Sequence, residues 1–180
     1  LAGGGLIPIA QVDASALGTP WVTFTSGIDS TYDMYKIFIC DITPGASNGN
    51  LLMRVSNDAG SSWQTGSNYM YVIYGSYSTS GSSQTVDASD TSIKLTHSTG
   101  NSHHVDGDAV YEINIAKPSS TTSPKVFSWW GANMNNTQLT HYQGGGIFNG
   151  NTSAITGLQL FLSDSASLTG SFRLYGIAKS

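Results

Sequence analysis

The chain has 180 residues, which suits one domain with a hydrophobic core large enough to fold without disulfides or metal ions. Only 10% of the residues are charged, the net charge is −4, and the seven lysines and arginines are scattered along the chain. These features argue against a nucleic-acid-binding surface, which needs a basic patch, and against a membrane span, which needs roughly 18 consecutive apolar residues.

Apolar and polar residues alternate with a period of two through most of the chain, and no long stretch carries a helical stripe. This pattern predicts antiparallel β-strands with one buried face. In chain order, the expected strands are 6–13, 21–25, 35–42, 51–56, 63–74, 92–96, 109–116, 125–130, 139–148, 155–162 and 172–177. The polar segments 76–90, 97–108 and 118–124 are expected to be loops.

The spacing of these segments predicts an all-β fold, namely an antiparallel jelly-roll-like β-sandwich of about ten strands that forms a single domain over residues 1–180. The N-terminal segment 1–13 is expected to be able to contact a neighbouring molecule. The low charge suits a protein that hides much of its surface in an assembly. Cys40, the single cysteine, lies in an apolar run and is expected to be a small buried hydrophobe.

The segment 56–63, with the sequence SNDAGSSW, resembles the Asp-box, the S-x-D-x-G-x-T-W turn of sialidases, with Ser62 in place of threonine. Asp58 is expected to bond its own turn backbone, Gly60 to supply a positive φ, and Trp63 to return to the apolar face. These three residues therefore predict a structural hairpin. The resemblance implies no catalysis, because a sialidase needs three arginines and this chain has two.

The densest group of possible metal ligands consists of His103, His104, Asp106 and Asp108, but their spacing matches no known metal-binding loop. A solvated turn without a metal ion is the prediction. The chain also lacks the nucleophile turn of serine hydrolases, the zinc motif of metalloproteases and a glycine loop that binds phosphate. Glu112 is its only glutamate, so the spacing gives no support to a glycosidase carboxylate pair. We therefore expect no enzyme and no cofactor.

Trp129 and Trp130 are adjacent on an expected strand, so their side chains point to opposite faces. One indole is expected in the core. The other, together with Tyr142 or a tyrosine from 69–77, can form an exposed aromatic platform that binds a sugar or a protein partner. A role in packing alone is the competing interpretation. Trp129, Trp130 and Tyr142 are thus the candidate interface residues.

Three segments resemble a family of small structural proteins of tailed bacteriophages, many of them marine. They are GGLIPIA at 4–10, FTSGIDSTYDMY at 24–35 followed by DITPG at 41–45, and GSFRLYGIAK at 170–179. The resemblance extends over nearly the whole chain. It implies a virion component of the head decoration, tail or fibre, and it implies no catalytic residues.

The resemblance and the residue pattern together lead to a hypothesis. The protein is a non-enzymatic capsid decoration protein that stabilises the phage head through contacts with the major capsid protein or other virion proteins. A homo-oligomer is expected, with a trimer as the first choice because virion components commonly lie on symmetry axes. Neither nucleic acid nor a membrane is an expected partner. Two alternatives stay open: a tail or fibre adhesin that binds host-surface glycans, and a cellular carbohydrate-binding module.

Overall fold

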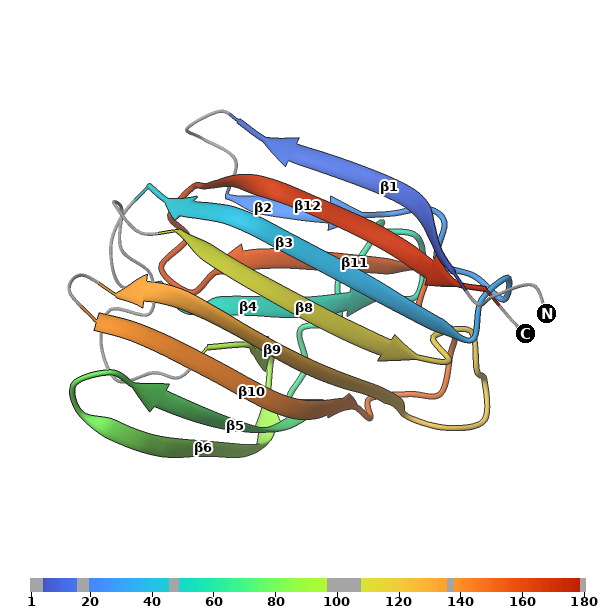
Figure 1. Cartoon of the computed structure of the whole chain (residues 1–180). Coiled ribbons are helices and arrows are strands. Elements are labelled where there is room, and N and C mark those ends of the chain that lie inside the picture. The colour runs from blue at the N-terminus through green and yellow to red at the C-terminus, as the bar shows by residue number, and fades with distance from the viewer. Residues whose placement is uncertain (1–4, 16–19, 46–48, 97–107, 136–137, 179–180) are drawn as a thin grey trace.

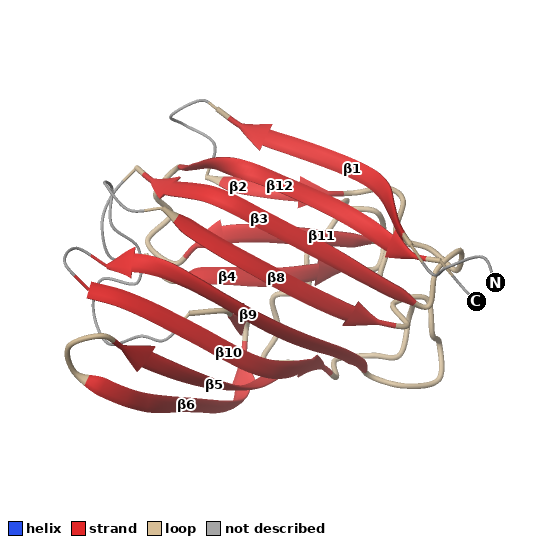
Figure 2. Ribbon diagram, in the orientation of Figure 1, coloured by secondary structure: helices blue, strands red, loops and turns tan. Residues whose placement is uncertain are grey.

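The computed structural model describes residues 5–15, 20–45, 49–96, 108–135 and 138–178. All the regular secondary structure in these ranges is β-strand, as Figure 2 shows. The strands are β1 (Leu6–Ala14), β2 (Trp21–Phe24), β3 (Met34–Pro44), β4 (Leu51–Ser56), β5 (Tyr69–Tyr77), β6 (Gly81–Asp90), β7 (Ile93–Lys94), β8 (Ala109–Ala116), β9 (Lys125–Asn135), β10 (Gln138–Phe148), β11 (Gly157–Leu162) and β12 (Leu168–Ile177). Within the described ranges, no helix is long and apolar enough to cross a membrane.

The strands form two sheets that lie on each other (Figure 1). The large sheet has eight strands in the order β1-β12-β3-β8-β9-β10-β5-β6, and the small sheet has four in the order β2-β11-β4-β7. Every pairing is antiparallel. The pairs are nested, since β1 and β2 pair with β12 and β11, and β3 and β4 pair with β8 and β7. This wrapping of the chain confirms the predicted jelly-roll-like sandwich.

The core lies between the two sheets and follows the alternation seen in the sequence. On β8, for example, Tyr111, Ile113 and Ile115 are buried while Val110 is exposed. The small sheet contributes inward side chains from all four of its strands: Val22, Phe24, Leu51, Met53, Val55, Ile93, Leu158, Leu160 and Leu162. One continuous apolar cluster results, and its removal from water is the main force that holds the sheets together.

Two expected elements differ from the sequence prediction. The segment 76–90, expected to be a loop, contains the end of β5 and the whole of β6, which pair as a hairpin. Residues 63–68, expected to begin a strand, lie outside regular structure, and β5 begins at Tyr69. The expected loop at 118–124 is confirmed, whereas 97–107 lies outside the described residues.

The N-terminal segment is part of the chain's own sandwich where it is described. Residues 6–13 belong to β1, which pairs with β12 and forms one edge of the large sheet. The side chains of Leu6 and Ile7 are exposed there. The other edge of β1 has no strand beside it in the described residues, so contact with a neighbour stays a prediction.

Candidate functional site

The turn after β4 has the predicted internal geometry. The Asp58 carboxylate accepts hydrogen bonds from Ser56 Oγ at 2.6 Å, Ser62 Oγ at 2.6 Å and the Ser62 backbone N–H at 2.9 Å. These bonds, that from Ser56 first, lower the pKa of Asp58 to about 2. Gly60 has the expected positive φ, +85°. The turn is nevertheless no hairpin, because β4 lies in the small sheet and β5 in the large one. It starts the crossing between the sheets, and Trp63 then lies half-buried on the outside of the small sheet.

Two of the three candidate platform residues lie in the core. Trp129 is 3% exposed, and its indole Nε1 donates a hydrogen bond to the backbone oxygen of Leu95 at 2.9 Å. Tyr142 is 1% exposed, and burial raises the pKa of its phenol to about 12. Tyr142 lies directly opposite Gly131 on β9. Gly131 is two residues after Trp129 on the same strand, so Gly131 and Tyr142 face the core as Trp129 does. An exposed platform containing Trp129 or Tyr142 is therefore wrong.

Trp130 is the predicted residue that reaches the surface. Its side chain is 46% exposed on the outer face, by which we mean the surface of the large sheet that points away from the small sheet. The ladder places it opposite Glu112 on β8 and Gln143 on β10, and Gln143 in turn opposite Tyr74 on β5. Tyr74 is one of the tyrosines expected as a partner, and it is exposed. A notch of about 360 Å³ lies between Trp130 and Tyr74, because Gly145 next to them has no side chain.

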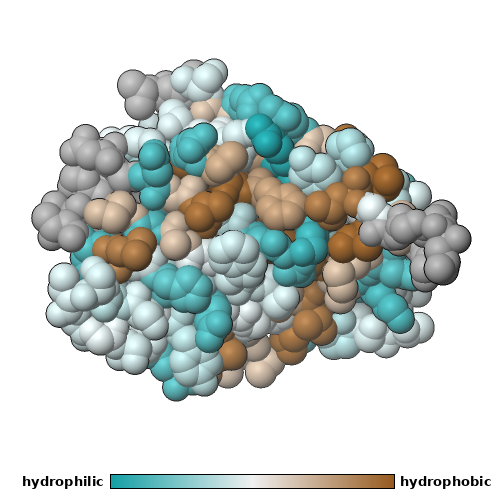
Figure 3. Space-filling view, viewed as in Figure 1, coloured by the Kyte–Doolittle hydropathy of each residue, from teal (hydrophilic) through white to brown (hydrophobic). Residues whose placement is uncertain are grey.

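Apolar side chains gather on the outer face. Most of the exposed large hydrophobic residues in the described part of the chain lie there: Met34, Tyr74, Val86, Val110, Val126, Trp130, Met134 and Leu139. Figure 3, viewed onto this face, shows brown apolar side chains spread across it with teal polar ones between them. An apolar face of this kind is typical of a contact surface.

The charged groups near the middle of the outer face offset one another. Lys36 forms an ion pair with Glu112, which is the only glutamate of the chain. The Lys36 ammonium also lies 5.8 Å from the centre of the Phe38 ring, which packs edge-on against Tyr175 at 5.5 Å. When a partner protein covers this face, burying an ion pair costs less free energy than burying a single unpaired charge. The Glu112 carboxylate is also occupied by this contact.

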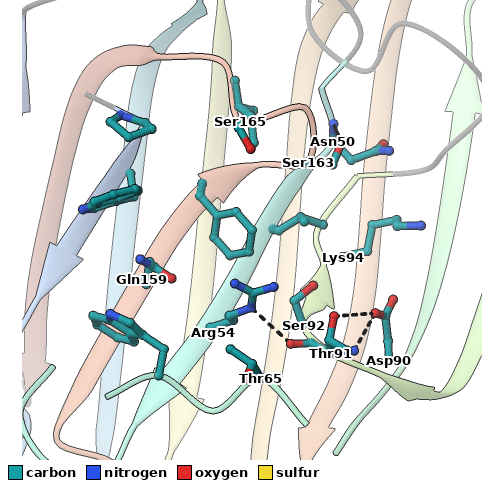
Figure 4. A pocket seen from close by; sticks show the side chains of 16 residues that line it. Asn50, Arg54, Thr65, Asp90, Thr91, Ser92, Lys94, Gln159, Ser163 and Ser165 are labelled. Carbon is teal, nitrogen blue, oxygen red and sulfur yellow. Dashed lines mark hydrogen bonds between the residues drawn. The ribbon is translucent and has the colours of Figure 1, made fainter. Parts of the chain in front are cut away.

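A larger hollow, of about 590 Å³, lies on the opposite side of the molecule, over the outward surface of the small sheet (Figure 4). We call it the hollow, and it is lined by Pro20, Trp21, Asn50, Leu52, Arg54, Trp63, Thr65, Asp90, Thr91, Ser92, Lys94, Gln159, Phe161, Leu162, Ser163 and Ser165. Two cross-strand rows form its floor. One runs Trp21–Phe161–Leu52–Lys94, and the other consists of Gln159 and Arg54.

Arg54 occupies the middle of the hollow. Its Nε donates a hydrogen bond to the backbone oxygen of Thr91 at 3.2 Å, and its guanidinium carbon lies 4.5 Å from the centre of the Phe161 ring. Among the lining residues, Asp90 is the sole carboxylate. It accepts hydrogen bonds from the Tyr71 hydroxyl at 2.7 Å and the Thr91 backbone N–H at 2.6 Å. Burial, followed by the contact with Asp90, raises the pKa of the Tyr71 phenol.

Sequence reasoning did not find the hollow. The outward positions of Trp21, Arg54 and Phe161 could be read from the alternation, but nothing local in the sequence says that β11 lies between β2 and β4. The two strands that flank β11 come from the first third of the chain, so only the topology brings these side chains together.

The other predicted residues carry no site in the described structure. His103, His104 and Asp106 lie outside the described residues, and Asp108 is exposed just before β8. Within the described ranges, no group of three or more His, Cys, Asp or Glu residues could hold a metal ion. Cys40 is half-buried on the outer face instead of fully buried, because it alternates with the inward Ile39 on β3.

Comparisons with known proteins give little. No family model matches the chain, and no curated protein matches it. The GH43 protein BlXynB from Bacillus licheniformis is 10% identical with a TM-score of 0.34, and covers 81% of this chain, which spans only 28% of that protein. The catalytic domain of an endo-1,3-beta-glucanase (laminarinase) from Thermotoga petrophila is 10% identical with a TM-score of 0.26, over 88% of this chain and 69% of that domain. Likenesses this weak carry no argument about function.

Proposed function

We propose that the protein is a non-enzymatic structural protein of a tailed-phage particle, a head decoration protein that attaches to the capsid through its outer face. The observation that carries this proposal is the concentration of exposed apolar and aromatic side chains on that face. Aromatic residues and methionine are enriched in the cores of protein interfaces, and charged residues are depleted there. The resemblance of three sequence segments to phage structural proteins supports the same role.

The notch beside Trp130 gives the outer face a feature that a partner can fill. Trp130 and Tyr74 stand on either side of Gln143, and Gly145 opens the space next to them. An aromatic or aliphatic side chain of the capsid protein would be buried there between two rings, which is the usual form of an interface anchor. The ion pair of Lys36 with Glu112 would stay intact under the partner.

The edge strand β1 supports a further contact between copies in a trimer. Its unpaired edge can add to a strand of a neighbouring copy, and the exposed Leu6 and Ile7 side chains would be covered by that contact. Trimers on the local symmetry axes of the head would repeat the same contact three times. Light scattering of the purified protein measures the mass of the assembly directly.

Reconstruction of purified particles tests the proposal. We expect density of this fold on the head, with the outer face turned toward the major capsid protein. Density on the tail or fibre alone would reject the decoration role and favour the adhesin alternative. Absence from particles would favour the cellular carbohydrate-binding alternative.

A matched pair of variants tests the surface itself. Val126 is exposed on the outer face, and Val126→Asp would place an unpaired carboxylate in the contact. We expect it to abolish attachment to particles that lack the protein, because an unpaired charge is costly to bury. Trp21→Ala, on the opposite side of the molecule, should attach normally. Normal attachment of the Val126 variant, with both variants folded, would contradict the use of this face.

A further inference from the structure

The hollow contains a side-chain amide, that of Gln159, which is free to bind a ligand. Gln159 is 8% exposed, and in the described part of the chain its side chain has no hydrogen-bond partner. It lies directly opposite Arg54 in the β11–β4 ladder, so both side chains project from the same outward row. Figure 4 shows Gln159 next to Arg54, which lies near the middle of the hollow. No hydrogen bond to another described residue occupies this amide, so a ligand can bind it without displacing a bond within the protein.

The Arg54 guanidinium next to it is only partly used. Nε bonds to the Thr91 backbone and one face of the group covers Phe161, but no carboxylate in the described residues pairs with its two terminal amino groups. A guanidinium held in place by such contacts is pre-organised to bind a carboxylate through two parallel hydrogen bonds. Arg54 and Gln159 together therefore form a site for an acidic group.

The charge balance favours an anion at this end of the hollow. Lys94 and Asp90 both lie on the opposite side of Arg54 from Gln159 in Figure 4, and their charges offset each other in part. The carboxylate of Asp90 is held by the Tyr71 hydroxyl and the Thr91 backbone. The lining thus holds two cations, Arg54 and Lys94, against the one carboxylate of Asp90, and this excess of positive charge favours an anionic ligand.

Aromatic rings complete the surroundings of this acidic-group site. Trp21 is 52% exposed and Trp63 is half-buried, and both side chains line the hollow. An exposed indole packs well against the C–H face of a sugar ring, and side-chain amides and guanidinium groups bond to its hydroxyl and carboxylate oxygens. The volume of about 590 Å³ lies within the range of small-molecule sites, about 300–1,000 Å³.

A peptide is a poorer occupant than a saccharide. Peptides commonly bind sheets by adding a strand at a free edge, whereas the centre of the hollow lies over β11 and β4, which are paired on both sides. Recognition there relies on side chains alone. The aromatic rings, the Gln159 amide and the terminal amino groups of Arg54 together match a sugar that carries a carboxylate.

We infer that the hollow over the small sheet binds an acidic saccharide of the uronic-acid class, with its carboxylate on Arg54 and Gln159 and its ring against the indoles of Trp21 and Trp63. This site lies on the opposite side of the molecule from the outer face, so a copy attached through the outer face presents the hollow outward. The inference does not depend on the proposed function, because it rests on other residues.

Calorimetric titration of the full chain with uronic-acid oligosaccharides tests the inference. The panel contains oligogalacturonate, oligomannuronate and oligoglucuronate, each with its methyl ester as the uncharged match. We expect at least one acid to bind and its ester to bind about tenfold more weakly or worse. Arg54→Gln should weaken binding of the acid by about tenfold, Arg54→Lys by less, and Gln159→Ala measurably. Trp21→Ala should weaken the acid and the ester alike.

Trp130→Ala, on the other side of the molecule, is the control and should bind as the unaltered chain does, with melting curves confirming that each variant is folded. Failure of every acid to bind, equal binding of acid and ester, or equal loss in the Trp130 variant would overturn the assignment. A glutamate-rich peptide that binds as tightly as the sugars would do so too, since it would reveal a site for charge alone. Attachment of Arg54→Gln to particles reports separately on the proposed function.

Discussion

At the scale of single residues, two adjacent glycines on β10 occupy opposite faces of the large sheet. A Cβ on Gly144 would lie 2.3 Å from Cζ2 of Trp129 and 2.7 Å from the backbone oxygen of Val72. A Cβ on Gly145 would meet only the backbone oxygen of Phe127, at 3.8 Å. We expect Gly144→Ala to lower the free energy of unfolding by about 1–3 kcal/mol, because the indole and a strand backbone would both have to move.

Gly145→Ala is the matched control, and it should change the free energy of unfolding by less than about 0.5 kcal/mol. Urea denaturation of the two variants measures both values. Equal stability of the two variants would show that Trp129 does not fill the space above Gly144. Because Gly145 borders the notch on the outer face, the same variant also reports whether a methyl group there hinders attachment.

At the scale of one element, β9 carries two adjacent tryptophans, of which one packs in the core and the other lies on the surface. The indole of Trp129 fills the core and bonds to Leu95, which follows β7 of the small sheet, so it joins the two layers. We expect Trp129→Ala to lower the free energy of unfolding by about 3–5 kcal/mol. Trp130→Ala should change it by less than about 1 kcal/mol, because that indole is 46% exposed. Thermal or urea unfolding checks both, and comparable losses in the two variants would contradict the assignment of faces.

The elements also explain how far the sequence could be read. Alternation on β3, β8 and β9 predicted those strands and the sandwich, because each has one face in the core. The alternation did not predict β6, because this edge strand consists mostly of exposed polar residues such as Ser, Gln and Thr. Its strand conformation depends on the backbone pairing with β5. The pair Trp129–Trp130 predicted that one indole would be buried, but the choice between them depends on neighbours in the ladder.

The candidate sites were harder to predict than the fold, for a reason that lies in the topology. The row Trp21–Phe161–Leu52–Lys94 draws its residues from four strands that are far apart in the chain. The notch beside Trp130 likewise needs Tyr74 from β5 and Gly145 from β10. The sequence pattern predicts which side chains of one strand face outward. A site on a sheet also depends on the outward side chains of the neighbouring strands that lie beside them in the ladder, and the pattern does not predict those.

At the scale of the whole molecule, the two sheets divide the surface between two kinds of binding. The large sheet presents a broad apolar face that contains the ion pair of Lys36 and Glu112. The small sheet presents the hollow, in which the Arg54 guanidinium bonds to a backbone oxygen and has no carboxylate partner among the described residues. The core lies between the two sheets, so a side chain substituted on one outward surface does not contact residues on the other. Variants at Val126 and at Arg54 should therefore affect attachment and saccharide binding independently.

The sandwich as a whole is also expected to unfold at high pH, because tyrosines fill the space between its sheets. Burial raises the pKa of five of them, which are Tyr35, Tyr69, Tyr71, Tyr111 and Tyr142. The pKa is raised to about 12 for Tyr69 and for Tyr142. The folded chain thus holds these phenolic protons more tightly than the unfolded chain, whose tyrosines titrate near pH 10. Their contribution to stability is fully present below pH 10 and is lost as the pH rises above it, through about 12 for Tyr69 and Tyr142.

Each unit of pKa difference corresponds to about 1.4 kcal/mol, so the loss should be large enough to unfold the protein between pH 10 and 12. Lys125 acts in the opposite direction, since burial lowers the pKa of its ammonium, but it is one group against five. Urea denaturation at stepped pH measures the free energy of unfolding, and phenolate absorbance follows the tyrosines. The part of the phenolate signal that comes from the five buried tyrosines should appear together with unfolding, because burial opposes their ionisation in the folded chain. A stability that stays constant to pH 12, or phenolate absorbance from all nine tyrosines near pH 10 in a folded chain, would show that the tyrosines are not sealed between the sheets.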